Sequence, residues 1–231
     1  DRVRVTLMVP SGADPHHYEP TPRQMVDVAS AAAYCKVGSG IEFELEWMDN
    51  LAAQNPAMAI VDCSAGIEVH DGDPHVWTSP RNAKIMIENI LSGLSLVDPA
   101  GGTAYATNGL RYSAELAQLD SDIASLLSAA NERHFLIYHP SFSYLARDYD
   151  LVQLPIEEEG KAPTPHLLQE CVDRAVEHHL QYVYVAPQSA TSEAQSIAEA
   201  IGGELLYVDP LPGDYLSAMR ATAAALALEF E

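Results

Sequence analysis

The sequence predicts an α/β protein in which two α/β lobes with parallel sheets flank one long helix. Short runs rich in β-branched and aromatic residues alternate with stretches of helical period, which is typical of strands joined by helical crossovers. Residues 99–134 keep a helical period well beyond the usual helix length. The alternation of strand and helix patterns then begins again. A length of 231 residues suits two modest domains or one large one.

Each element is assigned from its local pattern. The run 3–10 has the residue pattern of a strand and ends at a proline. The stretch 20–38 has the pattern of a helix that begins at two closely spaced prolines. Residues 35–40 fit a strand end and turn. Further helices are expected at 41–54, 79–99, 164–179, 192–202 and 214–228, and further strands at 57–64, 134–140, 151–160 with a loop, 182–187 and 204–210. The expected domains are an N-terminal lobe at 1–98, a connecting helix at 99–131 and a C-terminal lobe at 132–231.

The chain is strongly acidic. Twelve Lys and Arg residues stand against 33 Asp and Glu residues, which gives a formal net charge of -21. Nucleic acid and anionic membrane surfaces should therefore repel it, and we expect no nucleic-acid partner. Although 48% of the residues are hydrophobic, no apolar run is long enough to span a bilayer.

The three cysteines carry no metal or redox pattern. Cys35, Cys63 and Cys171 are widely spaced and form neither CxxC nor a zinc-ribbon motif. We expect each of them to pack as a small apolar residue. One disulfide remains an alternative if the chain is exported.

Histidines stand where expected strands give way to loops. Asp-Pro-His occurs twice, ending at His16 and His75, and His139 follows a strand. Side chains beyond the carboxyl ends of parallel strands converge although they are distant in sequence. Convergent imidazoles favour zinc, copper or nickel, whereas oxygen donors alone favour calcium or magnesium. Asp209, after the last expected strand, would complete a tetrahedral zinc set of three histidines and one aspartate.

The remaining histidines have simpler interpretations. A single histidine at a strand end more often caps or packs than binds metal, and it is the repeated Asp-Pro-His that favours a metal at His16 and His75. His178 and His179 fit solvated residues near a helix C-terminus, where the helix dipole favours positive charge. The sequence leaves His134 and His166 unassigned.

A zinc hydrolase is the competing class. His139 and Ser141, or the acidic run 157–159, would then be catalytic, and the metal would need an open coordination position. The sequence contains no GxSxG, HExxH or phosphate-binding glycine loop. Because four protein ligands close a zinc site to water, we expect metal capture and no enzymatic activity.

Four motifs follow one another along nearly the whole chain. They are GADPHHYEPTPRQ (12–24), DPHVWTSPRNA (73–83), YHPSFSYLARDYDL (138–151) with EEEGKAPTP after it, and YVDPL (207–211) followed by DYLSAMR. In this order they resemble the zinc and manganese solute-binding proteins of ABC transporters, of the ZnuA and TroA type.

The resemblance implies a two-lobed receptor with a long rigid helix between its lobes and a divalent metal in the interlobe cleft. Its ligands, carried over by motif, are His16, His75, His139 and Asp209. Zinc receptors of this family have a histidine at the third ligand position, which is His139 here, whereas manganese receptors tend to have glutamate there. The resemblance therefore favours Zn²⁺ over Mn²⁺. The implied receptor is periplasmic or otherwise extracytoplasmic and delivers its metal to an ABC transporter permease. A surface adhesin on the same scaffold is the alternative.

The chain departs from the family pattern in two places. Relatives usually carry a strand and a helix before the run 3–10, so we expect either that these elements precede Asp1 in a longer chain or that the N-terminal lobe is smaller. Any membrane anchor is expected in a segment preceding Asp1. We expect a monomer, although an exposed edge strand would let a second copy pair. The histidine-rich acidic loop before the second motif is missing, and His70 and Asp71 are its only remnants.

Carboxylates are expected beside the ligands. Asp14, Glu19 and Asp73 are the candidates to accept a hydrogen bond from the second ring nitrogen of a ligand, which would fix its tautomer. Asp14 and Asp73 also precede prolines, where shaping a turn is the alternative role. Because protons compete with a metal for imidazole, we expect the metal affinity to fall steeply below about pH 6.

Overall fold

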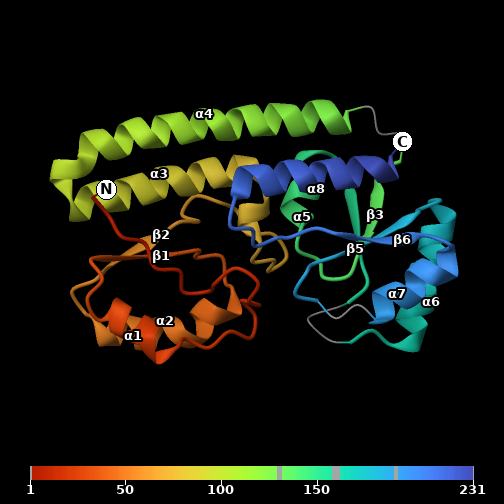
Figure 1. Ribbon diagram of the computed structural model, residues 1–231, viewed down its shortest axis with the longest axis horizontal. Coiled ribbons are helices and arrows are strands. Elements are labelled where there is room, and N and C mark those ends of the chain that lie inside the picture. Colours follow the sequence, from red (N-terminus) through yellow and green to blue (C-terminus); the bar gives the residue numbers. More distant parts are fainter. Residues whose placement is uncertain (1, 129–131, 158–161, 190–191, 231) are drawn as a thin grey trace. The chain divides into compact units, whose positions relative to one another are not determined.

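The computed structural model describes residues 2–128, 132–157, 162–189 and 192–230 (Figure 1). The chain divides into two compact units, Asp1–Ala117 and Gln118–Glu231. The first unit contains α1 (Pro22–Val28), β1 (Ala33–Lys36), α2 (Glu42–Gln54), β2 (Ala59–Asp62), the 3₁₀ turn η1 (Val76–Thr78), α3 (Pro80–Val97), the 3₁₀ turn η2 (Pro99–Gly101) and the start of α4 (Gly102–Leu127). The second contains the end of α4, β3 (His134–Ile137), α5 (Ser143–Asp148), β4 (Val152–Pro155), α6 (Pro165–Glu177), β5 (Tyr182–Val185), α7 (Ser192–Ile201), β6 (Glu204–Tyr207) and α8 (Tyr215–Glu229). The predicted α/β class with parallel strands and one long helix is confirmed.

In the first unit, helices cover both faces of a two-stranded parallel sheet (Figure 1). Tyr34 of β1 is buried in a core with Phe43 and Leu51 of α2. On the other face α3 approaches β2 so closely that a Cβ on Gly93 would lie 2.3 Å from a methyl carbon of Val61. Glycine at this position therefore allows the helix to lie directly on the strand.

The prediction of a strand at 3–10 is wrong. Val5 and Leu7 are 77% and 64% exposed, and the described sheet of this unit pairs β1 only with β2. The side-chain amide of Gln24 donates to the carbonyl oxygens of Leu7 and Met8 at 2.9 and 2.7 Å. A strand needs hydrogen bonds to the backbone of a neighbouring strand, whereas these two carbonyl oxygens accept hydrogen bonds from a side chain.

The helix expected over 20–38 ends early, because α1 ends at Val28. Thr21 caps the start of α1, since its hydroxyl accepts the N–H of Gln24 while the Gln24 side chain accepts the N–H of Thr21. The alanine-rich stretch after Val28 is compatible with a helix. Burial of Tyr34 and pairing with β2 make its second half a strand instead, so tertiary contacts override helix propensity.

The long helix α4 begins and ends inside the expected stretch 99–134. Its 26 residues extend about 39 Å. Near its start it packs tightly on α3, where a Cβ on Gly109 would lie 2.1 Å from Leu91. The strand β3 already begins at His134, which limits the helix at its C-terminal end. Among the described helices, α4 included, none combines the length and apolar character needed to cross a membrane.

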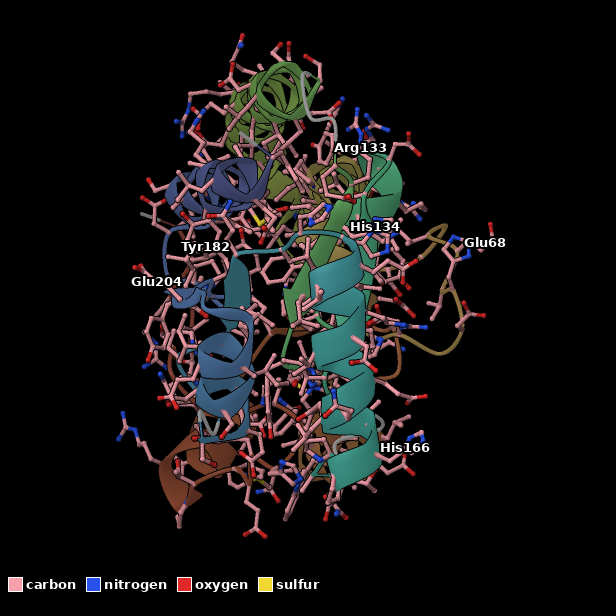
Figure 2. All side chains as sticks on the ribbon, turned by 90° about the vertical axis from the view of Figure 1, so that its right-hand side faces the viewer. Glu68, Arg133, His134, His166, Tyr182 and Glu204 are labelled. Carbon is pink, nitrogen blue, oxygen red and sulfur yellow. The ribbon has the colours of Figure 1, made fainter. Side chains whose placement is uncertain are left out.

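The second unit has a four-stranded parallel sheet in the order β4-β3-β5-β6. α6 and α7 stand side by side over one face (Figure 2), where Cys171, Ala175 and Ile197 pack against strand residues such as Val183. On α8, the carbonyl oxygen of residue 225 accepts a hydrogen bond of 2.9 Å from the hydroxyl of Tyr184 on β5. The short helix α5 has no counterpart in the sequence prediction. Because all four strands run in one direction, the loops after them gather at one edge of the sheet.

Candidate metal centre

Two histidines of the first unit face each other through their Nε2 atoms. His16 lies in the loop before α1, and His75 immediately precedes η1. Their Nε2 atoms are 3.2 Å apart, and the ring planes are tilted by 54°. Two ligand atoms about 2.1 Å from one tetrahedral metal lie roughly 3.4 Å from each other. The separation therefore fits two ligands of the same ion.

Each of these imidazoles has a carboxylate at its other ring nitrogen. His16 Nδ1 lies 2.6 Å from Glu42 Oε2, and His75 Nδ1 lies 2.6 Å from Asp73 Oδ1. Since an ionised carboxylate only accepts hydrogen bonds, Nδ1 carries the proton and Nε2 presents a lone pair. Two lone pairs facing at 3.2 Å repel each other unless a cation lies between them. Metal-ligating histidines have this carboxylate–imidazole arrangement.

The loop that carries His75 is fixed from several sides. Asp73 Oδ1 also accepts the backbone N–H of His75 at 2.9 Å. The Ser39 hydroxyl donates to the carbonyl oxygen of Pro74 at 2.5 Å, and the ring of Trp77 meets the His75 ring edge-on at 5.3 Å between centroids. His75 is only 4% exposed. The ring is thus held in place by the folded chain.

Asp14 has a different role from Asp73, although both precede a Pro-His pair. It accepts the backbone N–H of His16 at 2.9 Å and the Nδ1–H of His17 at 2.7 Å. Burial raises the pKa of the Asp14 carboxyl, but these hydrogen bonds outweigh it and leave the pKa below its ordinary value. Asp14 thus shapes the turn, while Glu42 contacts the His16 ring. Glu19 is exposed.

In the second unit, His139 follows β3 and has the same kind of partner. Its Nδ1 lies 2.6 Å from Oε1 of Glu157, which follows the neighbouring strand β4. The backbone N–H of Glu157 donates to the carbonyl oxygen of Tyr138 at 3.0 Å, which extends the ladder beyond the strands. His139 therefore also directs Nε2 away from a carboxylate. Glu158 and Glu159, the rest of the acidic run, lie outside the described residues.

Asp209 follows β6 at the same edge of the sheet. Its Oδ1 accepts the side-chain amide of Gln188, which follows β5, at 3.2 Å, and the N–H of Leu211 at 2.9 Å. β5 lies between β3 and β6, so the strands that carry His139 and Asp209 are about 10 Å apart. The contacts of Asp209 in the structure are thus with its own loop and with Gln188.

Two carboxylates beside the histidines were missed by the sequence analysis. Glu42 is the first residue of α2, where an acidic side chain already has a local explanation in the helix dipole. Glu157 follows a strand next to β3, so the strand-end rule that selected His139 would also have selected it. In the sequence, Glu157 was considered only as part of the acidic run 157–159, among the catalytic groups of the competing hydrolase.

The model of the family described as zinc-uptake complex component A, periplasmic (ZnuA), matches residues 1–228. The chain belongs to the ZnuA family.

Relatives in the ZnuA family match at moderate identity. The high-affinity zinc uptake system protein ZnuA of Bacillus subtilis (strain 168) is 27% identical over 92% of this chain and 73% of its own. The iron-binding protein YfeA of Yersinia pestis is 29% identical over 95% of this chain and 76% of its own. A crystal structure of a ZnuA deletion mutant with zinc bound superposes with a TM-score of 0.93, at 36% identity over 99% of this chain and 90% of that one.

Proposed function

We propose that this chain captures zinc outside the cytoplasmic membrane and delivers it to an ABC transporter permease. The observation that carries the proposal is the pair of facing Nε2 atoms of His16 and His75, each with its Nδ1–H on a carboxylate. The zinc-uptake and periplasmic description of the ZnuA family supports both the cargo and the compartment. In this proposal zinc is what the protein carries.

His139 and Asp209 complete the proposed ligand set. His139 is supported by its Nδ1 contact with Glu157, the same arrangement that orients His16 and His75. Asp209 is supported by the two hydrogen bonds to its Oδ1, which fix the direction of the carboxylate. Three imidazoles and one carboxylate make a tetrahedral zinc set.

Zinc is favoured over manganese because of this donor set. Imidazole suits zinc, copper and nickel, whereas manganese prefers sites richer in oxygen. One relative is named for iron binding, so iron belongs among the competitors in any selectivity measurement.

A zinc hydrolase is the competing activity, and the donor set argues against it. Catalytic zinc keeps a position for water or substrate, while four protein ligands occupy the whole tetrahedron. We therefore propose capture without turnover.

The test begins with the metal content of protein purified without added metal. Zinc, manganese and ferrous iron are then titrated into the chelator-stripped chain, its His139→Ala variant and a His166→Ala control. His166 has a side chain that is 84% exposed on α6, so its removal leaves the proposed set intact. We expect one tightly bound zinc in the wild type and the control, and at least about a hundredfold loss in His139→Ala. Equal zinc affinity in all three proteins would refute the ligand set.

Delivery is tested in cells that lack this chain. Zinc accumulation should return with the wild-type protein and fail with His139→Ala produced at the same level. Full restoration by the variant would mean that zinc uptake does not depend on this site.

A further inference from the structure

A second group of side chains that could bind a metal lies in the second unit, away from His139 of the same unit. Glu132, His134 and His178 place one ligand atom each within 4.8 Å of one another. His134 Nδ1 lies 2.5 Å from Glu132 Oε1, and His178 Nδ1 lies 3.5 Å from Glu132 Oε2. One carboxylate thus faces two imidazoles. The sequence left His134 unassigned and treated His178 as solvated, but the two rings are stacked with their centroids 3.6 Å apart.

The carboxylate at the centre of this group is oriented by the backbone. Glu132 Oε1 accepts the N–H of Arg133 at 2.7 Å and the N–H of His134 at 2.8 Å. The Arg133 guanidinium donates a hydrogen bond to the carbonyl oxygen of Leu127. All three members of the group are about one quarter to one third exposed, so an ion can reach them from solvent.

The charge around the group favours a cation. The side chain of Glu229 accepts two backbone N–H groups nearby. Burial raises the pKa of Glu229, and the negative charge of Glu132 adds to this increase. The carboxylates of Glu132 and Glu229 therefore lie in the same region, and their charge makes the local electrostatic potential more negative.

The group lies at the opposite end of β3 from His139. His134 is the first residue of β3, whereas His139 follows its carboxyl end, and five extended residues cover roughly 16 Å. Figure 2 shows His134 beside the end of α6 that is remote from His166, which lies near the start of that helix. Glu132, His134 and His178 are therefore separate from His139.

We propose that Glu132, His134 and His178 form a second binding site for a divalent transition metal, with zinc as the fitting probe. Two imidazoles and one carboxylate supply three protein ligands and leave the fourth position to water. Ligand atoms around one tetrahedral metal lie roughly 3.4 Å apart, so no pair in the group needs to close by more than about 1.4 Å. The hydrogen bond between His134 Nδ1 and Glu132 Oε1 has to lengthen and release its proton to the solvent when both atoms bind the ion.

Binding requires the stacked rings to open. The interplanar angle is 28°, so the two ring planes, in which the nitrogen lone pairs lie, are nearly parallel. Rotation of one imidazole about its χ2 angle lets the lone pairs converge on one ion. This rearrangement makes the second site weaker than one whose rings already converge.

The alternative is that the group is a structural ion bridge between α6 and the start of β3. Calorimetric zinc titration of the chelator-stripped full chain separates the two, in the wild type and in His75→Ala, which lacks the first proposed site. We expect two binding events in the wild type and one remaining event in His75→Ala.

A matched pair of variants then locates the remaining event. His178→Asn removes a proposed ligand, whereas His179→Asn changes the exposed neighbour at a positive φ of 56°, which asparagine tolerates. In the His75→Ala background, His178→Asn should weaken the remaining event at least about tenfold while His179→Asn leaves it unchanged. Glu132→Gln, which keeps the shape of the side chain, should weaken it as well, with far-ultraviolet circular dichroism checking the fold.

Two results would overturn the second site. One is the absence of zinc binding in His75→Ala with the fold intact, which would leave the group as a structural bridge. The other is a remaining event that His178→Asn and Glu132→Gln do not change. Loss of the first event in His75→Ala concerns only the proposed function, so the two proposals can fail separately.

Discussion

Oδ1 of Asp73 accepts both the backbone N–H and the Nδ1–H of His75, at 2.9 and 2.6 Å. A single carboxylate oxygen therefore fixes the turn and the tautomer of the buried histidine together. In the second Asp-Pro-His motif, proline restricts the backbone while aspartate orients the histidine ring.

Replacing Asp73 by asparagine should weaken zinc binding by about 10- to 100-fold, because an amide accepts the Nδ1–H less strongly and raises the ligand basicity less. The measurement is competition with a chromophoric chelator at fixed pH. Asp71→Asn is the control, since Asp71 is exposed in the same loop. Identical affinities in the two variants would mean that Asp73 serves only the turn.

Replacing His75 by alanine should lower zinc affinity at least about a hundredfold, or about 2.7 kcal/mol, because it removes a proposed ligand whose Nε2 lies 3.2 Å from His16 Nε2. Equilibrium dialysis measures the loss. His17→Ala provides the matched control: His17 is adjacent to His16, its side chain is 79% exposed, and it bonds to Asp14. A loss in His17→Ala as large as that in His75→Ala would mean that His17, and not His16, is the ligand that GADPHHYEP supplies.

The N-terminal segment is tied to the turn before α4 by a pH-dependent contact. Arg2 donates two hydrogen bonds of 2.8 Å to Asp98, and the Tyr105 hydroxyl donates a third of 2.6 Å. These bonds lower the pKa of Asp98 from 3.8 to about 2. A depressed carboxyl pKa stabilises the folded state above the unfolded pKa, and the contribution disappears as the pH falls through the folded pKa.

Asp98→Asn should therefore lower the Tm at pH 6. The difference in Tm between the wild type and the variant should disappear as the pH falls from about 4 to about 2. Thermal unfolding followed by circular dichroism measures the gap, with Asp71→Asn as the reference. A gap that stays constant down to pH 2 would show that the loss at pH 6 has another cause than the charge of Asp98.

Cys35 should be the reactive thiol of the chain. The hydrogen bond with the Cys63 thiol lowers the pKa of Cys35 to about 7, against an opposing effect of burial, and it raises the pKa of Cys63. Cys35 is exposed, while Cys63 and Cys171 are buried. Alkylation of the folded chain should reach half its maximal rate near pH 7, and Cys63→Ala should move this midpoint toward 9. Peptide mapping identifies the labelled cysteine, and a midpoint unmoved by Cys63→Ala would contradict the assigned hydrogen bond.

The sequence predicted those parts of the fold whose pattern is local. Strong helical periods located α2, α3 and α6 to α8, and the apolar runs located β2 to β6. The two errors in the first unit have a tertiary cause. Residues 3–10 alternate like a strand but have a side chain, Gln24, where a ladder would be, and the alanines before β1 are helical by propensity but lead into a buried strand at Tyr34.

For the candidate site, the sequence reached the histidines but only part of their surroundings. Asp-Pro-His and the strand ends selected His16, His75 and His139 as ligands, and Asp73 was selected as an orienting carboxylate. Glu42 and Glu157 come from other segments, and only the three-dimensional structure brings them to His16 and His139. Glu42 leaves no short-range signal of this contact, whereas Glu157 had one in its position shortly after a strand.

The immobile setting of His75 has a kinetic consequence. The ring is buried, bonded to Asp73 and braced by Trp77, so the entropy of ordering this ligand is lost during folding and not when the metal arrives. Such an ordered ligand slows spontaneous dissociation more than it speeds association. If His75 is a ligand as proposed, zinc would stay bound until a recipient distorts the ligand set. The rate of transfer would then depend on the recipient and not on the residence time in the free protein.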